Sequence, residues 1–413
     1  MVKISIIMPV FNGGEFLERS IRSIDEQTLN DIELICVDDG STDNSLELLN
    51  QYSNDYKFIK VISQDNQGSG KARNTGISNA TGDYIAFLDA DDIFIDGDAL
   101  EMMYKIAEIN GADIVSANLQ FVNRDYTLKE NPHYGRGDYA YFDGEGEINP
   151  NDYGIPYAFY KNIFKKEFLD MHEIVFPDLL RGQDPVFLSK ALGNTDVVYT
   201  CSRNLYGYNH SVGGGVNNKM NNYQKKKSYV QHFRDACDEL ARDGLVKISA
   251  EYKLHLTRYL NWKKNNKDED LFRIYGIIFP DRYEYFTQDD ENFTVFNTAA
   301  ESYLLYYSDD EENFRIVKNH MKNTDESVLP KHVREKYDLI MSSDSLDEYK
   351  DSYYNDKIDR LEKRHKNLTD KIEELKKENA MLEEEAAGLE SDVGKVKSSK
   401  SFKIAKKFKN ILK

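Results

Sequence analysis

The sequence predicts an α/β fold in its N-terminal half, built on a mostly parallel, doubly wound sheet. Short apolar runs alternate with segments whose apolar residues recur at helical spacing, as in a parallel sheet covered by helices. Polar loops follow the first, second and fourth apolar runs. Because ligands bind beyond the carboxyl ends of parallel strands, we expect these three loops to meet at one edge and form a site.

The expected elements follow in chain order. Buried strands are predicted over residues 4–10, 32–37, 58–62, 84–88 and 114–117. Helices are predicted near residues 16–24, around 46–49, after residue 70, and over 99–109. From about Tyr126 to Gly215 the pattern gives way to Gly-, Asn- and Tyr-rich sequence. Residues 221–343 are typical of a mostly helical, polar accessory region, for which the residues predict no function.

The strand over residues 84–88 ends in Asp89, Asp91 and Asp92, with no Lys or Arg within several residues on either side. Carboxylate oxygens gathered at a strand end favour a hard divalent cation such as magnesium or manganese, which in turn binds a diphosphate. The alternative is that Asp91 or Asp92 caps the following helix.

Composition narrows the class of protein. The chain has 413 residues, enough for two or three domains, and a net charge of −18, which argues against nucleic acid as a partner. Three cysteines without a Cys-x-x-Cys spacing fit a reducing compartment better than a disulfide framework. No signal peptide is recognisable and no apolar run approaches the ~18 residues of a membrane span, so we expect a cytoplasmic protein.

The C-terminal part predicts a coiled coil over residues 358–396, because apolar residues recur there in alternating steps of three and four. One polar residue in this seam, Asn379, is able to fix the register. A parallel, in-register pair would bring like charges together: Lys371 and Lys376, Glu378 and Glu383, and Glu385 and Glu390. We therefore predict self-association or docking through this helix and leave its orientation open.

The last segment, residues 395–413, holds eight Lys and neither Asp nor Glu. Phe402, Ala405, Phe408 and Leu412 fall on one helical face among these lysines, which predicts an interfacial helix at an anionic membrane surface. The alternative is a frayed basic tail. Four segments are thus expected: residues 1–215, 216–350, 351–394 and 395–413.

Four motifs together resemble family-2 glycosyltransferases of the A-type fold, in particular those of cell-envelope polysaccharide and teichoic-acid-like synthesis. They are Ile6-Ile-Met-Pro-Val-Phe-Asn12, Val37-Asp-Asp-Gly-Ser-Thr-Asp43, Gly70-Lys-Ala-Arg-Asn-Thr-Gly76 and Phe87-Leu-Asp-Ala-Asp-Asp92. The resemblance covers about residues 1–215 and implies transfer of a sugar, usually from a uridine diphosphate donor, by an enzyme of the hexosyl- or N-acetylhexosaminyl-transferase kind.

The resemblance also implies where the donor binds. Asp39 would accept a hydrogen bond from the uracil imide, and a turn-forming aspartate is its alternative reading. Arg73 lies where a helix start favours an anion, although a lone Arg is usually a surface residue. The remaining base- and phosphate-binding positions implied are Pro9, Val10, Phe11 and Asn66.

In the Asp-x-Asp motif, Asp91 would bind Mn²⁺ or Mg²⁺ and Asp89 would contact the ribose or a metal-bound water, with Ala90 between them. By the same resemblance, His210 would be a further metal ligand, and Ser211 would reach a phosphate. The alternative for His210 is a structural histidine. Gly-rich flanks around this segment suggest a lid that orders when the donor binds.

An inverting transferase needs a base for the acceptor hydroxyl, which in this family is the Asp of a Glu-Asp pair about a hundred residues beyond the metal motif. Here the segment Arg181-Gly-Gln-Asp-Pro-Val-Phe187 occupies that place, so Asp184 is the predicted base. Gln183 stands where Glu is usual, so a second carboxylate is missing. On spacing alone, a helix cap before Pro185 is the favoured reading of Asp184.

The resulting hypothesis is a metal-dependent inverting glycosyltransferase that acts on a cell-surface polymer, a polyol phosphate or a lipid-linked glycan. Its tail is expected to bind peripherally at the inner membrane face. One alternative is a sugar nucleotidyltransferase, which would normally carry a basic, Gly-rich triphosphate loop; the first loop, Phe11-Asn-Gly-Gly14, has no basic residue. The other is a catalytically inactive scaffold with a transferase fold, against which intact Asp89, Asp91 and Asp184 argue.

Overall fold

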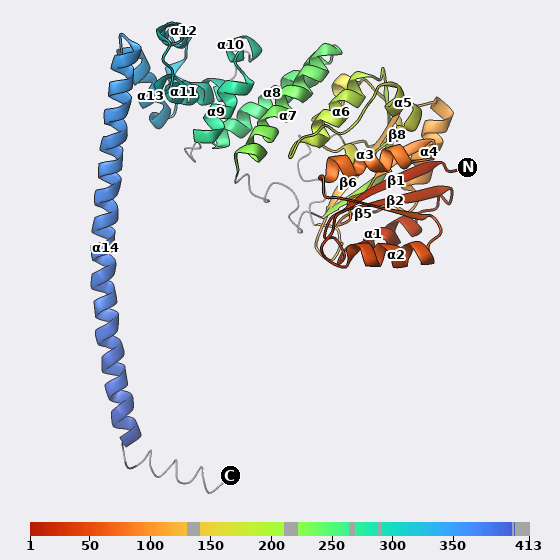
Figure 1. Ribbon diagram of the computed structural model, residues 1–413, viewed down its shortest axis with the longest axis horizontal. Coiled ribbons are helices and arrows are strands. Elements are labelled where there is room, and N and C mark those ends of the chain that lie inside the picture. The colour runs from red at the N-terminus through yellow and green to blue at the C-terminus, as the bar shows by residue number, and fades with distance from the viewer. Residues whose placement is uncertain (130–140, 210–221, 264–268, 287–290, 399, 401–413) are drawn as a thin grey trace. The chain divides into compact units, whose positions relative to one another are not determined.

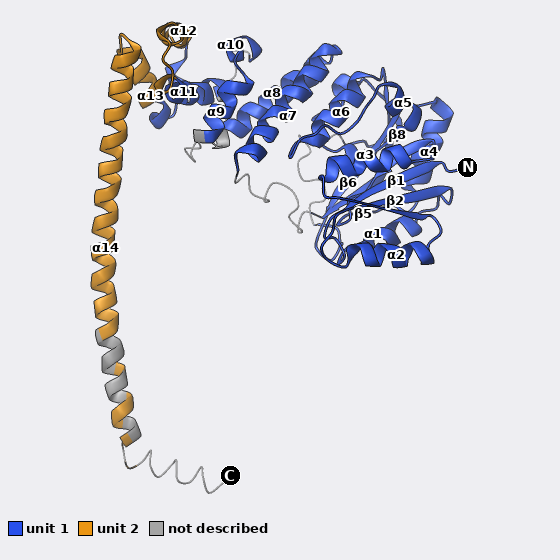
Figure 2. Cartoon of the chain, viewed as in Figure 1, with its two compact units in different colours: residues 1–304, 324–334 blue, residues 305–323, 335–413 orange. Residues whose placement is uncertain are grey.

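The computed structural model describes residues 1–129, 141–209, 222–263, 269–286, 291–398 and 400 (Figure 1). The chain divides into two compact units (Figure 2). The first comprises residues 1–304 and 324–334, and the second comprises residues 305–323 and 335–413. The first unit contains the sheet and the helices that cover it.

A nine-stranded sheet is the centre of the first unit, with the order β3-β2-β1-β4-β8-β6-β9-β5 and β7 beside β9. Neighbouring strands β3, β2, β1 and β4 are parallel, and so are β6 and β9. The strands are β1 (Ile4–Val10), β2 (Ile32–Asp39), β3 (Ile59–Gln64), β4 (Tyr84–Phe87), β5 (Ile93–Phe94), β6 (Ile114–Val122), β7 (Gly146–Ile148), β8 (Asn162–Lys165) and β9 (Val198–Asn209).

Helices pack on both faces of this sheet, each burying its apolar side. Successive residues of β1 point to opposite faces, so Ile6 joins the core under α1, α2 and α4, while Ile7 joins the core under α3, α5 and α6. These two layers confirm the predicted doubly wound α/β fold. The helices are α1 (Leu17–Asp25), α2 (Ser45–Asp55), α3 (Ser69–Asn79), α4 (Ala99–Asn110), α5 (Lys166–Met171) and α6 (Gln183–Gly193).

One strand of the sheet was not predicted from the sequence. The short strand β8 lies between β4 and β6 and runs antiparallel to both. The sequence pattern did not predict it because Asn162–Lys165 has only four residues and two of them are polar. The sheet is therefore mostly parallel, with an antiparallel insertion beside the strand that carries the acidic turn.

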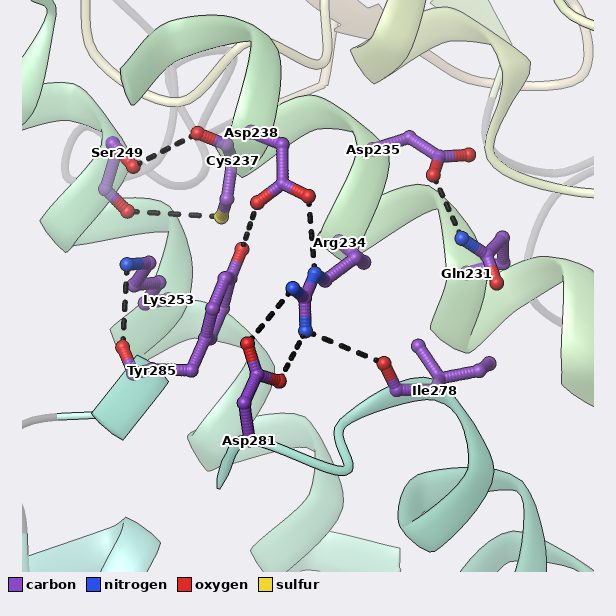
Figure 3. A network of polar contacts seen from close by, with 10 residues as sticks. All are labelled: Gln231, Arg234, Asp235, Cys237, Asp238, Ser249, Lys253, Ile278, Asp281 and Tyr285. Atoms are coloured by element: carbon purple, nitrogen blue, oxygen red, sulfur yellow. Dashed lines mark hydrogen bonds and ion pairs between the residues drawn. The ribbon is translucent and has the colours of Figure 1, made fainter. Parts of the chain in front are cut away.

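Helices α7 to α10 extend the first unit beyond the sheet. Their packing is fixed by Arg234, whose guanidinium donates to both oxygens of Asp281 at 2.6 and 3.0 Å and to Asp238 at 3.0 Å (Figure 3). Tyr285 also donates to Asp238, at 2.9 Å, so α7 is tied to α10 by a network of charge-assisted bonds. These helices are α7 (Tyr223–Arg242), α8 (Val246–Lys263), α9 (Glu269–Ile278) and α10 (Arg282–Tyr285).

The remaining helices lie later in the chain. They are α11 (Glu291–Tyr306), α12 (Glu311–Met321), α13 (Lys331–Ser342) and α14 (Leu346–Ser398). Helix α14 has 53 residues and includes all of the segment 358–396 for which a coiled coil is predicted. Among the described helices, none is both long and apolar enough to cross a membrane.

Candidate active site

The loops that follow β1 and β2 are bonded to each other. The Asn12 side-chain oxygen accepts from the Thr42 amide at 2.7 Å, and the Asn12 amide donates to Ser41 Oγ at 3.0 Å. The Gly13 amide donates to Ser45 Oγ at 3.0 Å. A Cβ at Gly13 would also lie 3.3 Å from Ala90 Cβ, so the loop after β1 packs against the acidic turn after β4. The three polar loops therefore meet at one edge of the sheet, as predicted.

Asp39 organises the loop that enters α3. One of its oxygens accepts from Gln64 Nε2 and the Gln67 amide, both at 2.9 Å, and the other accepts from the Gly68 amide at 2.7 Å. The residue is buried. The hydrogen bond from the uracil imide to Asp39 stays a prediction. The structure shows a second role for this carboxylate, because it accepts hydrogen bonds from three donors at the end of β3 and in the loop after it.

The predicted contact residues around this loop differ in exposure. Phe11 is half exposed at the end of β1, where its ring is available to a flat ligand, whereas Pro9, Val10 and Ala90 are buried beneath it. Asn66 is exposed in the loop before α3. These positions lie at or just beyond the carboxyl ends of β1 to β4, at the same edge of the sheet as Asp39.

The acidic turn is held by β9. Tyr206 Oη accepts from the Asp89 amide at 3.2 Å and donates to Asp92 at 2.6 Å, and the Asn209 amide donates to the same carboxylate at 2.6 Å. Burial and the charges of Asp91 and Asp89 raise the pKa of Asp92 well above its ordinary value. The capping alternative is wrong, because the next helix begins only at Ala99.

Arg73 joins the acidic turn to the predicted base. Its guanidinium contacts Asp89 at 2.7 Å and Asp184 at 3.3 Å, and its side chain is only 5% exposed. The rings of Phe159 and Phe176 lie 4.9 and 5.2 Å from it. Burial opposes the charge, yet the two carboxylates raise the pKa of Arg73 above its ordinary value. Two residues 95 positions apart in the sequence, Asp89 and Asp184, are thus brought to the same cation.

Asp184 lies in the first turn of α6, and the helix cap position is Gly182, not Asp184. Burial and then the charge of Asp89 raise the pKa of Asp184 to about 6, against the opposing effect of Arg73. Its side chain is still 37% exposed, so it is accessible to a ligand. Gln183, which stands where a second carboxylate was expected, instead accepts from Ser69 Oγ at 3.4 Å and packs against Gly70.

Helix α7 supports this turn from behind. The Leu180 amide donates to Ser228 Oγ at 3.1 Å. Gly182 has a φ of +82°, and any Cβ at this position would overlap with the imidazole of His232. His232 is fully buried and its Nε2 lies 2.9 Å from Tyr252 Oη on α8. The backbone that carries Asp184 therefore rests directly on side chains from α7.

Asp91 has the surroundings of a cation ligand. Burial, and then the charge of Asp89, raise the pKa of its carboxyl to about 6. In the part of the chain that the structure describes, Tyr126 donates to the Asp91 backbone carbonyl, and no other residue forms a hydrogen bond or ion pair with the Asp91 carboxylate. An isolated carboxylate with a raised pKa fits a divalent cation, which would replace the missing positive charge.

The described residues alone do not complete a metal site. Among them, no three His, Cys, Asp or Glu side chains converge as ligands. His210 and Ser211 lie outside the described residues. A cation held by one or two carboxylates and completed by donor phosphates is the usual arrangement for magnesium, and it fits these residues.

Several residues around the site were not predicted from the sequence. Tyr206 holds the acidic turn, Tyr126 donates to the Asp91 carbonyl at 3.2 Å, and Phe159 and Phe176 enclose Arg73. All are aromatic residues of the Tyr-rich stretch after Tyr126 or of β9, where the sequence has no periodic pattern to place them. Only the clustering of aromatic residues in that stretch was visible as a signal.

Comparison with known proteins agrees with this geometry. Residues 5–183 match the model of the family described as glycosyl transferase family 2. A cholesterol galactosyltransferase of Borreliella burgdorferi is 42% identical over 113 residues, which cover 27% of this chain and 31% of the relative. A poly(ribitol-phosphate) beta-glucosyltransferase of Bacillus spizizenii is 33% identical over 198 residues, 46% of this chain and 29% of the relative.

The chain thus spans only about a third of the length of these curated relatives. Among solved structures, residues 1–349 of S. aureus TarS in complex with UDP-GlcNAc share the fold, with a TM-score of 0.56 and 18% identity over 86% of this chain and 92% of that chain. The fold is therefore that of A-type glycosyltransferases, and residues 5–183 match the glycosyl transferase family 2 model.

Proposed function

We propose that this protein transfers a sugar from a uridine diphosphate donor to a hydroxyl group of its acceptor, with inversion at the anomeric carbon. The observation that carries the proposal is the position of Arg73, which contacts Asp89 of the acidic turn and Asp184 of the predicted base at once. A donor diphosphate at the first residue and an acceptor hydroxyl at the second would flank one sugar.

In this proposal Asp184 is the general base. A pKa of about 6 keeps its carboxylate mostly ionised at pH 7, yet basic enough to accept a proton from the attacking hydroxyl. The proton moves to Asp184 as the acceptor oxygen forms its bond to the anomeric carbon, and the bond from that carbon to the diphosphate oxygen breaks on the opposite side. Arg73 holds the carboxylate in place during this step.

The acidic turn would hold the leaving group. Asp91 is the proposed ligand of Mn²⁺ or Mg²⁺, with Asp89 near the ribose or a metal-bound water. When bound, the cation neutralises charge that develops on the departing diphosphate. Tyr206 and Asp92 fix the backbone of this turn, so the carboxylate of Asp91 is oriented before the donor arrives.

For the donor, we infer a UDP-linked hexose or N-acetylhexosamine. Support comes from S. aureus TarS, which binds UDP-GlcNAc and shares the fold. For the acceptor, the polymer named in the Bacillus spizizenii relative favours a polyol phosphate or another cell-surface glycan over a small soluble sugar. Peripheral membrane binding through residues 395–413 rests on their sequence, because residues 399 and 401–413 lie outside the described residues.

The deciding experiment measures release of UDP from a panel of UDP-sugars, with and without Mn²⁺, by the wild type and by Asp184→Asn. We expect one donor to be turned over, and the variant to lose at least ~100-fold in transfer rate while its affinity for UDP changes less than about twofold. A large loss of UDP affinity would remove Asp184 from the base role. Absence of both turnover and UDP binding would favour the inactive scaffold, and release of pyrophosphate from a nucleoside triphosphate would favour the nucleotidyltransferase.

A further inference from the structure

Helix α14 carries a long stripe of apolar side chains that are exposed rather than packed against other described residues. At its start, Leu346 and Tyr349 are buried within the second unit. From residue 361 to residue 383 every side chain is exposed. The stripe includes large apolar residues that are each about half exposed or more: Leu361, Leu368, Ile372, Leu375, Leu382, Leu389 and Val393. Apolar residues in regular sequence on a bare helix mark an interaction surface.

The spacing of the apolar residues in the stripe indicates that its partner is another helix. Its residues repeat with a period of seven, at the first and fourth positions of each heptad. The first positions include Ile372 and Val393, and the fourth positions are Leu at residues 361, 368, 375, 382 and 389. Branched residues at the first position with Leu at the fourth favour two strands. A second copy of this chain offers the same stripe, and is therefore the occupant that this surface fits.

The charged residues beside the stripe indicate whether the two helices run parallel or antiparallel. The residue just before each first position is basic early in the helix, as Arg364 and Lys371, and acidic later, as Glu378. In the sequence, the next two such positions, 385 and 392, are also acidic. A parallel pair would set Lys371 beside Lys376 of the second copy, and Glu378 beside Glu383. An antiparallel pair instead sets Lys371 beside Glu378 of the second copy, twice in each dimer.

The same antiparallel register aligns the stripe. It places Ile372 opposite Leu375 of the second copy and Leu368 opposite Asn379. Asn379 needs no partner Asn in this arrangement, because its Nδ2 already donates to Glu383 of its own helix at 3.0 Å. Lys371 pairs only with the exposed Glu374 one turn away, at 2.7 Å, so its charge is still available at the surface. We propose that α14 forms an antiparallel two-stranded coiled coil with α14 of a second copy.

The first test is a charge reversal in the full chain, followed by sedimentation equilibrium. Lys371→Glu would turn two attractive contacts of the antiparallel dimer into repulsive ones, so we expect its dissociation constant to rise about tenfold. Lys377→Glu, the same charge change on the outer face, is the control and should change it less than about twofold. Adding Glu378→Lys to Lys371→Glu should restore the dimer. A tighter dimer with Lys371→Glu alone would indicate parallel helices, and a monomer or trimer of the wild type would overturn the proposal.

The second test locates the partner residues by disulfide formation. The native cysteines Cys36, Cys201 and Cys237 are buried, so they do not compete in the native protein. A mixture of Leu368→Cys and Asn379→Cys chains should form mixed disulfides, and neither variant should form them alone. Disulfides within each single variant, without mixed species, would show a parallel pair and overturn the antiparallel one. Neither test uses enzymatic activity, so a failed donor assay would leave this proposal unaffected.

Discussion

Replacing Arg73 with Met would separate the two carboxylates that the guanidinium joins. Met keeps an apolar side chain between Phe159 and Phe176 but cannot bond to Asp89 or Asp184, which lie 2.7 and 3.3 Å from the guanidinium. The variant therefore removes the charge and leaves most of the packing. Its effect should appear first in the protonation of Asp184.

The size of this effect follows from the contacts. An opposite charge at such a distance lowers the pKa of a carboxyl by ~1–3 units, and the exposure of Asp184 favours the low end, about 1 unit. Since the pKa of Asp184 is about 6 with Arg73 present, it should rise to roughly 7 or above without it. At pH 7 the ionised fraction would then fall from about nine-tenths to about one half or less. A raised pKa means that activity is lost on the acid side and recovered at higher pH.

The assay is the pH dependence of kcat/KM between pH 5 and 9.5. For the wild type we expect the acid limb near pH 6, and for Arg73→Met a limb displaced upward, with partial recovery of rate at pH 9. Lys71→Met is the matched control, because Lys71 lies on the same helix and pairs with Asp178 at the surface, 3.1 Å away. A uniform loss of rate with an unmoved acid limb would refute the reasoning, since Arg73 would then not tune Asp184.

Two further substitutions test the supports of the site. Tyr206→Phe removes the hydroxyl that donates to the buried Asp92 and accepts from the Asp89 amide. We expect the unfolding free energy, measured by denaturant titration, to fall by ~1–2 kcal/mol and the KM for the sugar donor to rise. Unchanged values would show that the acidic turn keeps its conformation without Tyr206. Gly182→Ala should lower kcat at least ~10-fold with little change in donor KM, because its methyl overlaps His232. Adding His232→Ala should restore part of this kcat, whereas simple addition of the two losses would show that the residues are not coupled.

The early strands were predictable because each is a buried apolar run that ends in a polar turn. Because parallel strands end at the same edge of a sheet, the positions of Asp39 and Asp89 at that edge followed from the predicted strands alone. Strand β8 was not predictable in this way, since four residues with two polar side chains carry no periodicity. Its antiparallel position beside β4 depends on pairing across about 80 residues of sequence, which a local pattern does not encode.

The sequence predicted which residues lie at the site more completely than it predicted what each of them contacts. Arg73 was expected at an anion, and the anions that it contacts are two carboxylates of the protein itself. Asp184 was identified through family resemblance, since its spacing alone favoured a helix cap. Tyr206 was missed because its contacts with Asp89 and Asp92 span more than 110 positions of sequence, and nothing local to β9 indicates them.

The contact between α7 and the Asp184 turn determines where this protein can be divided. The family match ends at residue 183, but the turn rests on Ser228 and His232, which come after it. A chimera that joined residues 1–183 to the helices of another protein would keep the loops after β1, β2 and β4. It would lose Asp184 and the α7 side chains on which the turn before it rests. Domain swapping should therefore retain α7 together with the helices that share its core as far as Tyr303, so the useful junction lies after residue 304.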